Sequence, residues 1–222
     1  SQGEFPRVIL APRTLQECYT AAIQSFNLAE KYQCPALIIS DLYLAERLET
    51  FDGVDITNVP IERGEMVSQV TNGYRRFADT PTGVSPRALP GTPGAVHVAA
   101  TDEHDEDGVV ISDVFTNPAV RVKMMSKRMR KMEFLARELP TPKIDGPANA
   151  DLTLVGWGST YQVMLEAMEV LNHEGLKVNV LCLDVVWPFP AEAVKTLLES
   201  CKLTMSVEAN YTGQLVKLIR LE

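Results

Sequence analysis

LTLVGWGSTYQ, at residues 152–162, is the stretch from which the fold can be inferred. Its first part, residues 152–155, is a short apolar run that predicts a buried strand, and Gly156-Trp157-Gly158 predicts a tight turn directly after it. Ser159, followed three residues later by Gln162, has the pattern of a capping box, which begins a helix. Strand, tight turn and helix in this order are typical of a parallel α/β sheet.

The same alternation continues to the end of the chain. Two further apolar runs, residues 178–183 and 203–207, enclose a segment with helical spacing of Val194, Leu197 and Cys201. A turn at residues 208–213 then leads into a last helix. This order of strands and helices predicts a parallel sheet with helices on its faces.

The beginning of the chain shows a related pattern. Residues 7–11 and 36–40 are apolar runs on either side of a helical segment, and Thr14 with Glu17 has the capping-box spacing at the start of that helix. Strand, helix and strand form a βαβ unit, whose strands are parallel and whose crossover is right-handed. The predicted fold class is therefore α/β, with two three-layer modules and mainly parallel sheets.

The middle of the chain separates the two modules. Residues 49–94 are rich in Pro and Gly and have no sustained period, which indicates a functional segment or an excursion that packs on something else. Residues 96–100 predict one more strand. Gly and Pro near position 146 indicate a linker, so we expect a first domain at 1–139, a linker at 140–150 and a second domain at 151–222.

An acidic loop follows the last of these predicted strands. Five carboxylates and one imidazole occupy six consecutive positions: Asp102, Glu103, His104, Asp105, Glu106 and Asp107. The loop does not match a calcium-binding loop, because Val114 stands where the bidentate glutamate belongs, and one histidine makes no zinc site. We therefore predict no metal site.

Three interpretations of the acidic loop remain open: a solvated turn, a turn that neutralises nearby lysines and arginines, or a part of an active-site rim or subunit contact. The carboxylates beside His104 are expected to favour its charged form, which would make it a poor general base.

A basic helix is predicted after the loop, with Asn117 and Pro118 at its start and Pro140 after its end. Six apolar residues recur along it at helical spacing: Val122, Met125, Met129, Met132, Ala136 and Leu139. We expect this stripe to face the core. The lysines and arginines on its other faces are expected to pair with the acidic loop or with another chain.

Two loops at the carboxyl ends of predicted strands could bind an anion or a partner. The candidate residues are Gly156, Trp157, Gly158, Ser159 and Asn210. The first loop would present the free N–H groups of a helix N-terminus, but it lacks the glycine spacing and the lysine of nucleotide-binding loops. The alternative is a tight turn whose glycines allow close packing.

Composition restricts the partners. The net charge of −8 argues against nucleic acid, and no apolar run approaches the length of a membrane span. We therefore expect a cytoplasmic protein without nucleic-acid or membrane partners. The four cysteines lie in apolar segments without a C-x-x-C pair, which predicts buried free thiols in a reducing compartment.

Short motifs in order along the chain give a more specific indication. The stretches are GEFPR at 3–7, AEKYQCP at 29–35, YRRF at 74–77, GVSPR at 83–87, PGTPG at 90–94, DEHDEDG at 102–108, RMRK at 128–131, GWGST at 156–160, WPFP at 187–190 and NYTGQL at 210–215. Together they resemble the α subunit of 2-oxoacid:ferredoxin oxidoreductases, most closely the 2-oxoglutarate type. The start without methionine and the end at Leu221-Glu222 are then expected for an internal piece of a longer subunit.

The resemblance implies an enzyme that cleaves a 2-oxoacid with thiamine diphosphate, transfers the acyl group to coenzyme A and passes electrons through iron–sulfur clusters to ferredoxin. It implies the later part of a pyrimidine-binding domain at 1–139 and a transketolase C-terminal-like domain at 151–222. A β subunit would be the partner. Mg and the clusters would belong to the complete enzyme, and no cofactor is expected on this fragment alone.

No catalytic residue can be assigned within the chain, because the family's segment for substrate binding would lie upstream of Ser1. Arg7 and Arg87, with the acidic loop residues Asp102, Glu103, His104 and Asp105, are candidates for an active-site rim or a subunit contact. Two alternatives remain: a noncatalytic α/β assembly or ligand-binding module, and another thiamine-dependent transketolase-like enzyme.

Overall fold

The computed structural model describes residues 4–50, 53–54, 57–111 and 117–222. Gly3 of the GEFPR motif and Val114 of the calcium-loop comparison lie outside these residues. The chain forms two compact units whose segments alternate along the sequence. The first unit contains Ser1–Arg7, Phe26–Pro35 and Ile61–Glu138, and the second contains Val8–Ser25, Ala36–Pro60 and Leu139–Glu222.

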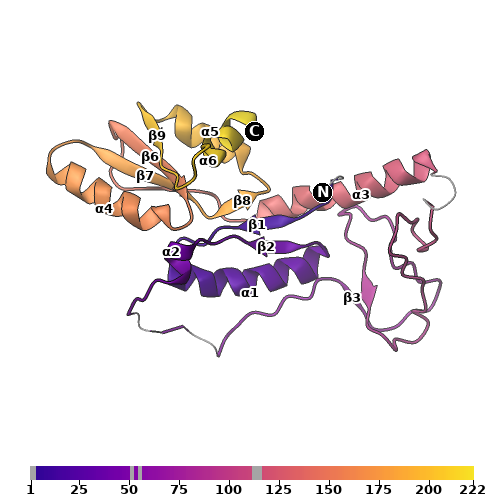
Figure 1. Cartoon of the computed structure of the whole chain (residues 1–222). Helices are drawn as coiled ribbons and strands as arrows, with labels where there is room; N and C mark the ends of the chain where they lie inside the picture. Colours follow the sequence, from indigo (N-terminus) through magenta and orange to yellow (C-terminus); the bar gives the residue numbers. More distant parts are fainter. Residues whose placement is uncertain (1–3, 51–52, 55–56, 112–116) are drawn as a thin grey trace. The chain divides into compact units, whose positions relative to one another are not determined.

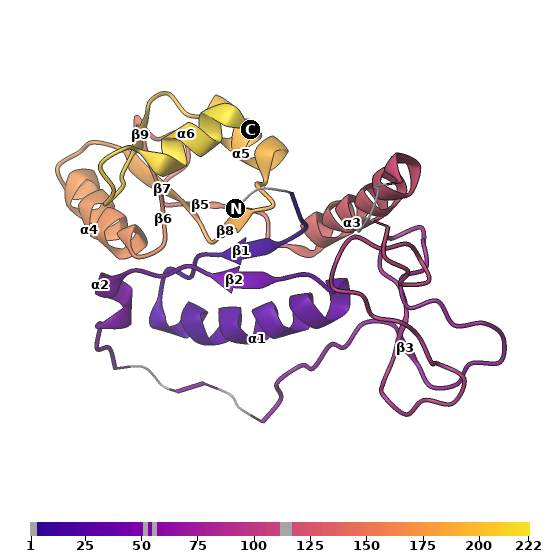
Figure 2. The same cartoon turned by 45° about the vertical axis from the view of Figure 1, so that its right-hand side comes forward.

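The second unit begins with the predicted βαβ arrangement. Strand β1 (Val8–Leu10) pairs in parallel with β2 (Ala36–Ile38), and α1 (Leu15–Tyr32) connects them. Helix α1 runs alongside β2 in both views (Figure 1, Figure 2). The hydroxyl of Thr14 accepts the N–H of Glu17 at 3.1 Å, so the predicted cap is present.

The strand at β2 is less buried than predicted. It lies at the edge of a three-stranded sheet in the order β2-β1-β8, and Leu37 and Ile38 are 41% and 40% exposed. Strand β8 (Val185–Trp187) is antiparallel to β1 and was not predicted, because only Asp184 separates it from the strand before it. A single turn of helix, α2 (Leu42–Ala45), follows β2.

The C-terminal sheet confirms the predicted parallel order. Its strands are arranged β5-β7-β6-β9, and β6 (Leu152–Trp157) is parallel to both β7 (Val178–Leu183) and β9 (Thr204–Ser206). Strand β5 (Ile144–Asp145) adds an antiparallel edge within the segment predicted as a linker.

Helices cover both faces of this sheet. On one face α4 (Thr160–His173) packs through Met164 against Leu154 and Val180, and on the other α5 (Ala191–Glu199) and α6 (Gln214–Leu221) pack around Leu181 (Figure 1). Because successive side chains of a strand point to opposite faces, β6 and β7 supply both cores. This is the predicted three-layer arrangement.

All four cysteines are free. Cys34 and Cys182 are 7% and 1% exposed, and Cys18 and Cys201 are partly buried. Burial raises the pKa of the Cys34 and Cys182 thiols. The prediction of buried thiols is thus confirmed for these two.

The first unit has one long helix, α3 (Pro118–Glu138), and much irregular chain. Its strands β3 (Met66–Val67) and β4 (Arg87–Ala88) are a short parallel pair. The strand predicted at residues 96–100 is wrong. Val96 and Val98 are 94% and 60% exposed, so this apolar run finds no sheet to join.

The buried face of α3 differs from the predicted apolar stripe. Its start is as expected, since the side chain of Asn117 accepts the N–H of Val120 at 3.3 Å. The buried residues, however, are Met124, Lys127, Lys131 and Leu135, and Val122 is 65% exposed.

Two local contacts explain the shift of face. The ammonium of Lys131 donates to the carbonyl of Gln33 at 3.1 Å, which gives a buried charge a polar partner. Gly83 lies so close to the helix that a Cβ there would come within 2.2 Å of the carbonyl oxygen of Lys127. The chain around Gly83 therefore covers the lysine-bearing face.

Among the residues that the structure describes, no helix combines the length and the apolar character that crossing a bilayer requires.

Candidate functional site

The acidic loop forms ion pairs with the basic helix that follows it. Glu103 lies between Arg121, at 3.0 Å, and Arg128, at 2.7 Å, and its side chain is only 11% exposed. Glu106 pairs with Lys123 on the same helix. The interpretation that the loop neutralises nearby cations is confirmed for these carboxylates. The loop is therefore held on α3 as a fixed element.

Asp105 shapes the loop itself. Its carboxylate oxygen accepts the N–H groups of Asp107 and Val109, both at 2.9 Å. Gly108 then turns the chain with φ 81°, and a Cβ there would lie 2.2 Å from the carbonyl oxygen of Val98. Asp105 thus contributes a local backbone turn.

His104 differs from the prediction of a charged imidazole. Its ring lies 4.0 Å from the ring of Phe77, and its buried Nδ1 has no hydrogen-bond partner in the described structure. Burial lowers the pKa of His104, and this outweighs the opposing effect of Glu103. The prediction was wrong because it counted the neighbouring carboxylates without the desolvation of the ring.

The two candidate arginines of the first unit already have partners. Arg87 forms an ion pair with Glu30 and donates to the carbonyl of Arg63 at 3.2 Å. Arg7 donates to the carbonyl of Phe5 at 3.3 Å and lies over the Phe5 ring. Asp102 is exposed at the start of the acidic loop. Among the candidate residues of the loop, Glu103 pairs with α3, whereas Arg7 and Arg87 are held by contacts of their own.

The second candidate group lies at the carboxyl edge of the C-terminal sheet. Gly156 allows α4 to approach β6, because a Cβ there would come within 2.6 Å of the Met164 methyl group and 2.7 Å of the Thr160 hydroxyl. Gly158 turns the chain with φ 59°. The hydroxyl of Thr160 donates to the carbonyl of Trp157 at 2.7 Å. Close packing therefore accounts for Gly156, and the left-handed backbone accounts for Gly158, where nothing lies within 4 Å of an added Cβ.

The predicted capping box at the start of α4 is wrong. Ser159 has helical backbone angles and caps no N–H group; its hydroxyl donates instead to the carboxylate of Asp41. Asp41 also caps α2 by accepting the N–H of Leu44 at 2.9 Å. The carboxylate of Asp41 thus lies beside the N-terminal end of α4. This is the place where the sequence suggested the binding of an external anion.

Asn210 lies in a similar arrangement at the N-terminus of α6. Its side-chain amide donates to Glu208 at 2.8 Å, and its Oδ1 accepts the N–H of Gln214 at 2.9 Å. Glu208 also accepts the N–H groups of Leu215 at 2.7 Å and Val216 at 3.0 Å. The chain's own carboxylate therefore meets the positive end of this helix.

Replacement of Glu208 by glutamine is expected to lower the free energy of unfolding by about 1–2 kcal/mol at neutral pH. Burial opposes ionisation of Glu208, but the donors around it lower its pKa overall. A lowered carboxyl pKa stabilises the fold above the unfolded-state value, and this stabilisation is lost as pH falls through the folded-state value. The difference between parent and variant in urea unfolding should shrink below pH 4.5, the usual value. Glu199→Gln, at an exposed position of α5, is the control; an equal effect of both would contradict this role.

One polar cluster of the first unit was not found from the sequence. The side-chain amide of Gln33 donates to the carbonyl of Ser85 at 2.6 Å and accepts from Arg76 at 2.9 Å, while its backbone carbonyl accepts from Lys131. Gln33 has φ 51°, so its backbone is in the left-handed region. Its position directly before Cys34-Pro35, where a helix must end, was the available signal.

No group of three or more His, Cys, Asp or Glu side chains comes together as a metal site in the described parts of the chain. Glu103 and Glu106 of the acidic loop pair with different cations of α3.

The chain matches two family profiles in succession. Residues 2–126 match the thiamine-diphosphate-binding region of pyruvate flavodoxin/ferredoxin oxidoreductases, and residues 150–222 match core domain II of pyruvate:ferredoxin oxidoreductase.

Curated relatives agree with these profiles. The chain is 35% identical, over 98% of its length, to the α subunit of 2-oxoacid:ferredoxin oxidoreductase 2 of Aeropyrum pernix, and covers 34% of that protein. It is 28% identical to the KorA subunit of 2-oxoglutarate oxidoreductase of Mycobacterium tuberculosis, over 98% of the chain and 32% of that subunit. The chain thus spans about a third of the length of these relatives.

A solved structure matches the whole chain. It is the 2-oxoglutarate:ferredoxin oxidoreductase of Magnetococcus marinus with 2-oxoglutarate, coenzyme A and succinyl-CoA bound, with a TM-score of 0.91 and 32% identity over 100% of this chain and 38% of that one. The predicted resemblance and the α/β fold class are confirmed. On the family profile that covers more than half of its residues, the chain belongs to the pyruvate flavodoxin/ferredoxin oxidoreductase family.

Proposed function

We propose that this chain is part of the α subunit of a 2-oxoacid:ferredoxin oxidoreductase, with 2-oxoglutarate as the substrate. The complete enzyme would remove carbon dioxide from the 2-oxoacid, transfer the acyl group to the thiol of coenzyme A, and pass the released electrons to ferredoxin. The observation that carries this proposal is the fold match over the full chain to the Magnetococcus marinus enzyme. A noncatalytic assembly module is less well supported, because the curated relatives are oxidoreductase subunits.

Thiamine diphosphate would supply the carbanion chemistry of the complete enzyme. The matching profile for residues 2–126 is described as thiamine-diphosphate-binding. The described residues do not fit magnesium or an iron–sulfur cluster, since no ligand group of three comes together among them. We therefore derive no step through these groups, and the absence of a cofactor on the chain alone stays a prediction.

The chain's own contribution would be a scaffold with contact surfaces. We propose domains at 1–139 and 151–222 with a connecting segment at 140–150. The acidic loop with Asp102, and the turns at Trp157 and Asn210, would contact the β subunit or the rest of the enzyme. The Glu103 pairs on α3 support this, because they hold the loop in one conformation before any partner binds.

Co-expression of the full-length α subunit with its β subunit should give reduction of a viologen dye that requires both 2-oxoglutarate and coenzyme A. Omission of coenzyme A is the control for thioester formation, and pyruvate tests the choice of 2-oxoacid. Faster turnover of pyruvate would contradict the 2-oxoglutarate assignment. No dye reduction with any 2-oxoacid, from a complex that contains thiamine diphosphate, would contradict the proposed function.

A further inference from the structure

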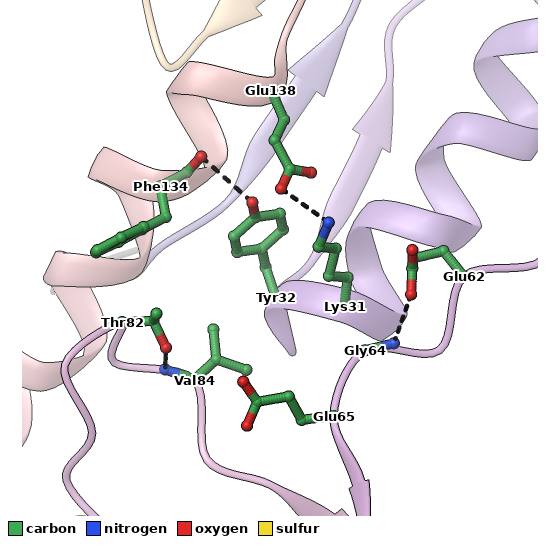
Figure 3. A pocket seen from close by; sticks show the side chains of 9 residues that line it. All are labelled: Lys31, Tyr32, Glu62, Gly64, Glu65, Thr82, Val84, Phe134 and Glu138. Atoms are coloured by element: carbon green, nitrogen blue, oxygen red, sulfur yellow. Dashed lines mark hydrogen bonds and ion pairs between the residues drawn. The ribbon is translucent and has the colours of Figure 1, made fainter.

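A cavity of about 380 Å³ lies in the first unit, lined by residues from the carboxyl ends of α1 and α3 and from two loop segments (Figure 3). Its volume is within the range of small-molecule sites. None of the candidate residues above lines it. We refer to it as the acidic cavity, for the charges described next.

One side of the acidic cavity is apolar and fixed. Tyr32 and Val84 are 3% and 7% exposed, and both line it together with Phe134. The hydroxyl of Tyr32 donates to the carbonyl of Phe134 at 3.2 Å, which fixes its ring (Figure 3). This side favours a ligand with a hydrocarbon body.

The charged groups of the cavity are mainly carboxylates. Lys31, the cation in its lining, forms an ion pair with Glu138 at 2.8 Å. Glu62 and Glu65 form no ion pair with any cation that the structure describes, and Glu62 accepts only the N–H of Gly64 at 3.2 Å. The carboxyl ends of α1 and α3 add partial negative charge. The cavity therefore has an excess of negative charge that Lys31 does not balance.

The segment that carries these two exposed carboxylates is held in place. Gly64 has φ 67°, and a Cβ there would lie 2.9 Å from the Cα of Lys31, so the chain lies directly on the end of α1. The N–H of Glu62 donates to the side chain of Asn27 at 2.9 Å. Arg63, between the two carboxylates, lies 3.9 Å from Glu30 and outside the cavity lining.

We propose that the acidic cavity binds an organic cation, a primary amine or a guanidinium group on an apolar chain. The charged group would lie between Glu62 and Glu65, and the chain would contact Tyr32, Val84 and Phe134. A metal cation is less favoured, because no group of three or more ligand side chains comes together among the described residues. This proposal does not depend on the proposed function. A free diamine and a lysine side chain of another polypeptide share the required chemistry.

The first experiment tests a free cation on the purified protein. Titration calorimetry with cadaverine, a five-carbon diamine, should give saturable binding that weakens as the salt concentration rises. The Glu62→Gln/Glu65→Gln double variant should bind about tenfold more weakly, because it keeps the shape and removes two charges. Pentanediol is the neutral ligand control. Glu133→Gln, an exposed residue of α3 outside the cavity, is the protein control.

The second experiment tests a lysine of another polypeptide, on the enzyme with its co-purifying subunits. A carbodiimide joins a carboxylate and an amine in direct contact as an amide, and takes up the water that is released. Mass spectrometry should find Glu62 or Glu65 joined to a lysine of a partner, and the link should be absent in the double variant. Circular dichroism of each variant reports whether the fold is kept.

The two arms separate the sources. Cadaverine binding that the double variant loses identifies a free cation, and a cross-link at either glutamate identifies a partner lysine. Absence of both results, or cadaverine binding that is equal in parent and double variant, would overturn the proposal.

Discussion

Replacement of Gly83 by alanine is expected to lower the free energy of unfolding by about 3 kcal/mol, through a left-handed backbone conformation and overpacking. The added Cβ would lie 2.2 Å from the carbonyl oxygen of Lys127, and φ at this position is 76°. The obstacle is backbone in the middle of α3, which cannot rotate away as a side chain can. Chemical denaturation followed by far-UV circular dichroism measures the loss.

Gly91→Ala is the matched control for this prediction. Gly91 has a similar φ of 91°, but nothing lies within 4 Å of a Cβ built there. Its replacement by alanine should therefore lower the free energy of unfolding by only about 1 kcal/mol, which is the energy of placing a Cβ-bearing residue in the left-handed backbone conformation. If both variants lost the same stability, contact between Gly83 and α3 would not be the cause.

Replacement of Lys127 by methionine is expected to raise the free energy of unfolding by about 2–3 kcal/mol at neutral pH. Burial lowers the pKa of Lys127 to about 8 from the usual 10.5, and the nearby cations Lys131 and Arg76 add to this effect. The described structure gives Lys127 no ion pair, so the folded protein holds a poorly solvated charge at 4% exposure. Methionine has a similar shape without that charge.

The pH dependence gives the sign of this effect. At neutral pH the lysine is charged in both the folded and the unfolded state, so the full penalty opposes folding. Between pH 8 and 10.5 the folded lysine loses its proton before the unfolded one, and the penalty disappears as pH rises. The gain of the methionine variant should therefore be largest near pH 7 and small near pH 10.5.

The measurement is a comparison of parent and variant at each pH. The raised pKa values of Cys182 and Tyr32 destabilise the folded state at alkaline pH, and they act equally on both proteins. Lys195→Met, at an exposed position of α5, should change stability little at any pH. A methionine variant that is less stable than the parent at pH 7 would contradict the prediction.

Lys127 also shows why part of the fold could not be predicted from the sequence. Hydrophobic periodicity assigns a helix face by counting apolar residues, and α3 has a regular methionine stripe through Met125 and Met129. A lysine can nevertheless be buried along its alkyl chain if its ammonium finds an acceptor, as Lys131 does at Gln33. That acceptor lies far away in the chain, so no local pattern indicates it.

The parallel strands β6, β7 and β9 of the C-terminal sheet were predictable for the opposite reason, whereas the edge strand β5 was not predicted. Strand β7 occupies the apolar run at 178–183, and a tight turn follows β6, because both depend on residues next to one another in the chain. The turn begins at Gly158 and not at Gly156 as predicted, since Gly156 and Trp157 belong to β6. Ser159 was predicted wrongly as a cap, since the partner of its hydroxyl, Asp41, comes from a distant segment. His104 was misjudged for the same reason, because its ring packs against that of Phe77, which comes from another segment.

The candidate site was predicted only as a set of segments. The acidic loop and α3 were expected to pair, and Glu103 and Glu106 do so. The acidic cavity was not found, because Glu62 and Glu138 are far apart in the sequence and have no motif in common. Such a site becomes visible only when the loop segment lies on the end of α1.

The buried thiols of Cys34 and Cys182 have a practical consequence for the study of local opening. Cys34 belongs to the first unit and Cys182 to the second, and each is almost inaccessible to reagents in the folded state. Either sulfur can be alkylated only when local unfolding exposes it. The rates of iodoacetamide labelling at the two positions would therefore report the rate of local opening in each unit separately. No cysteine would have to be introduced for this measurement.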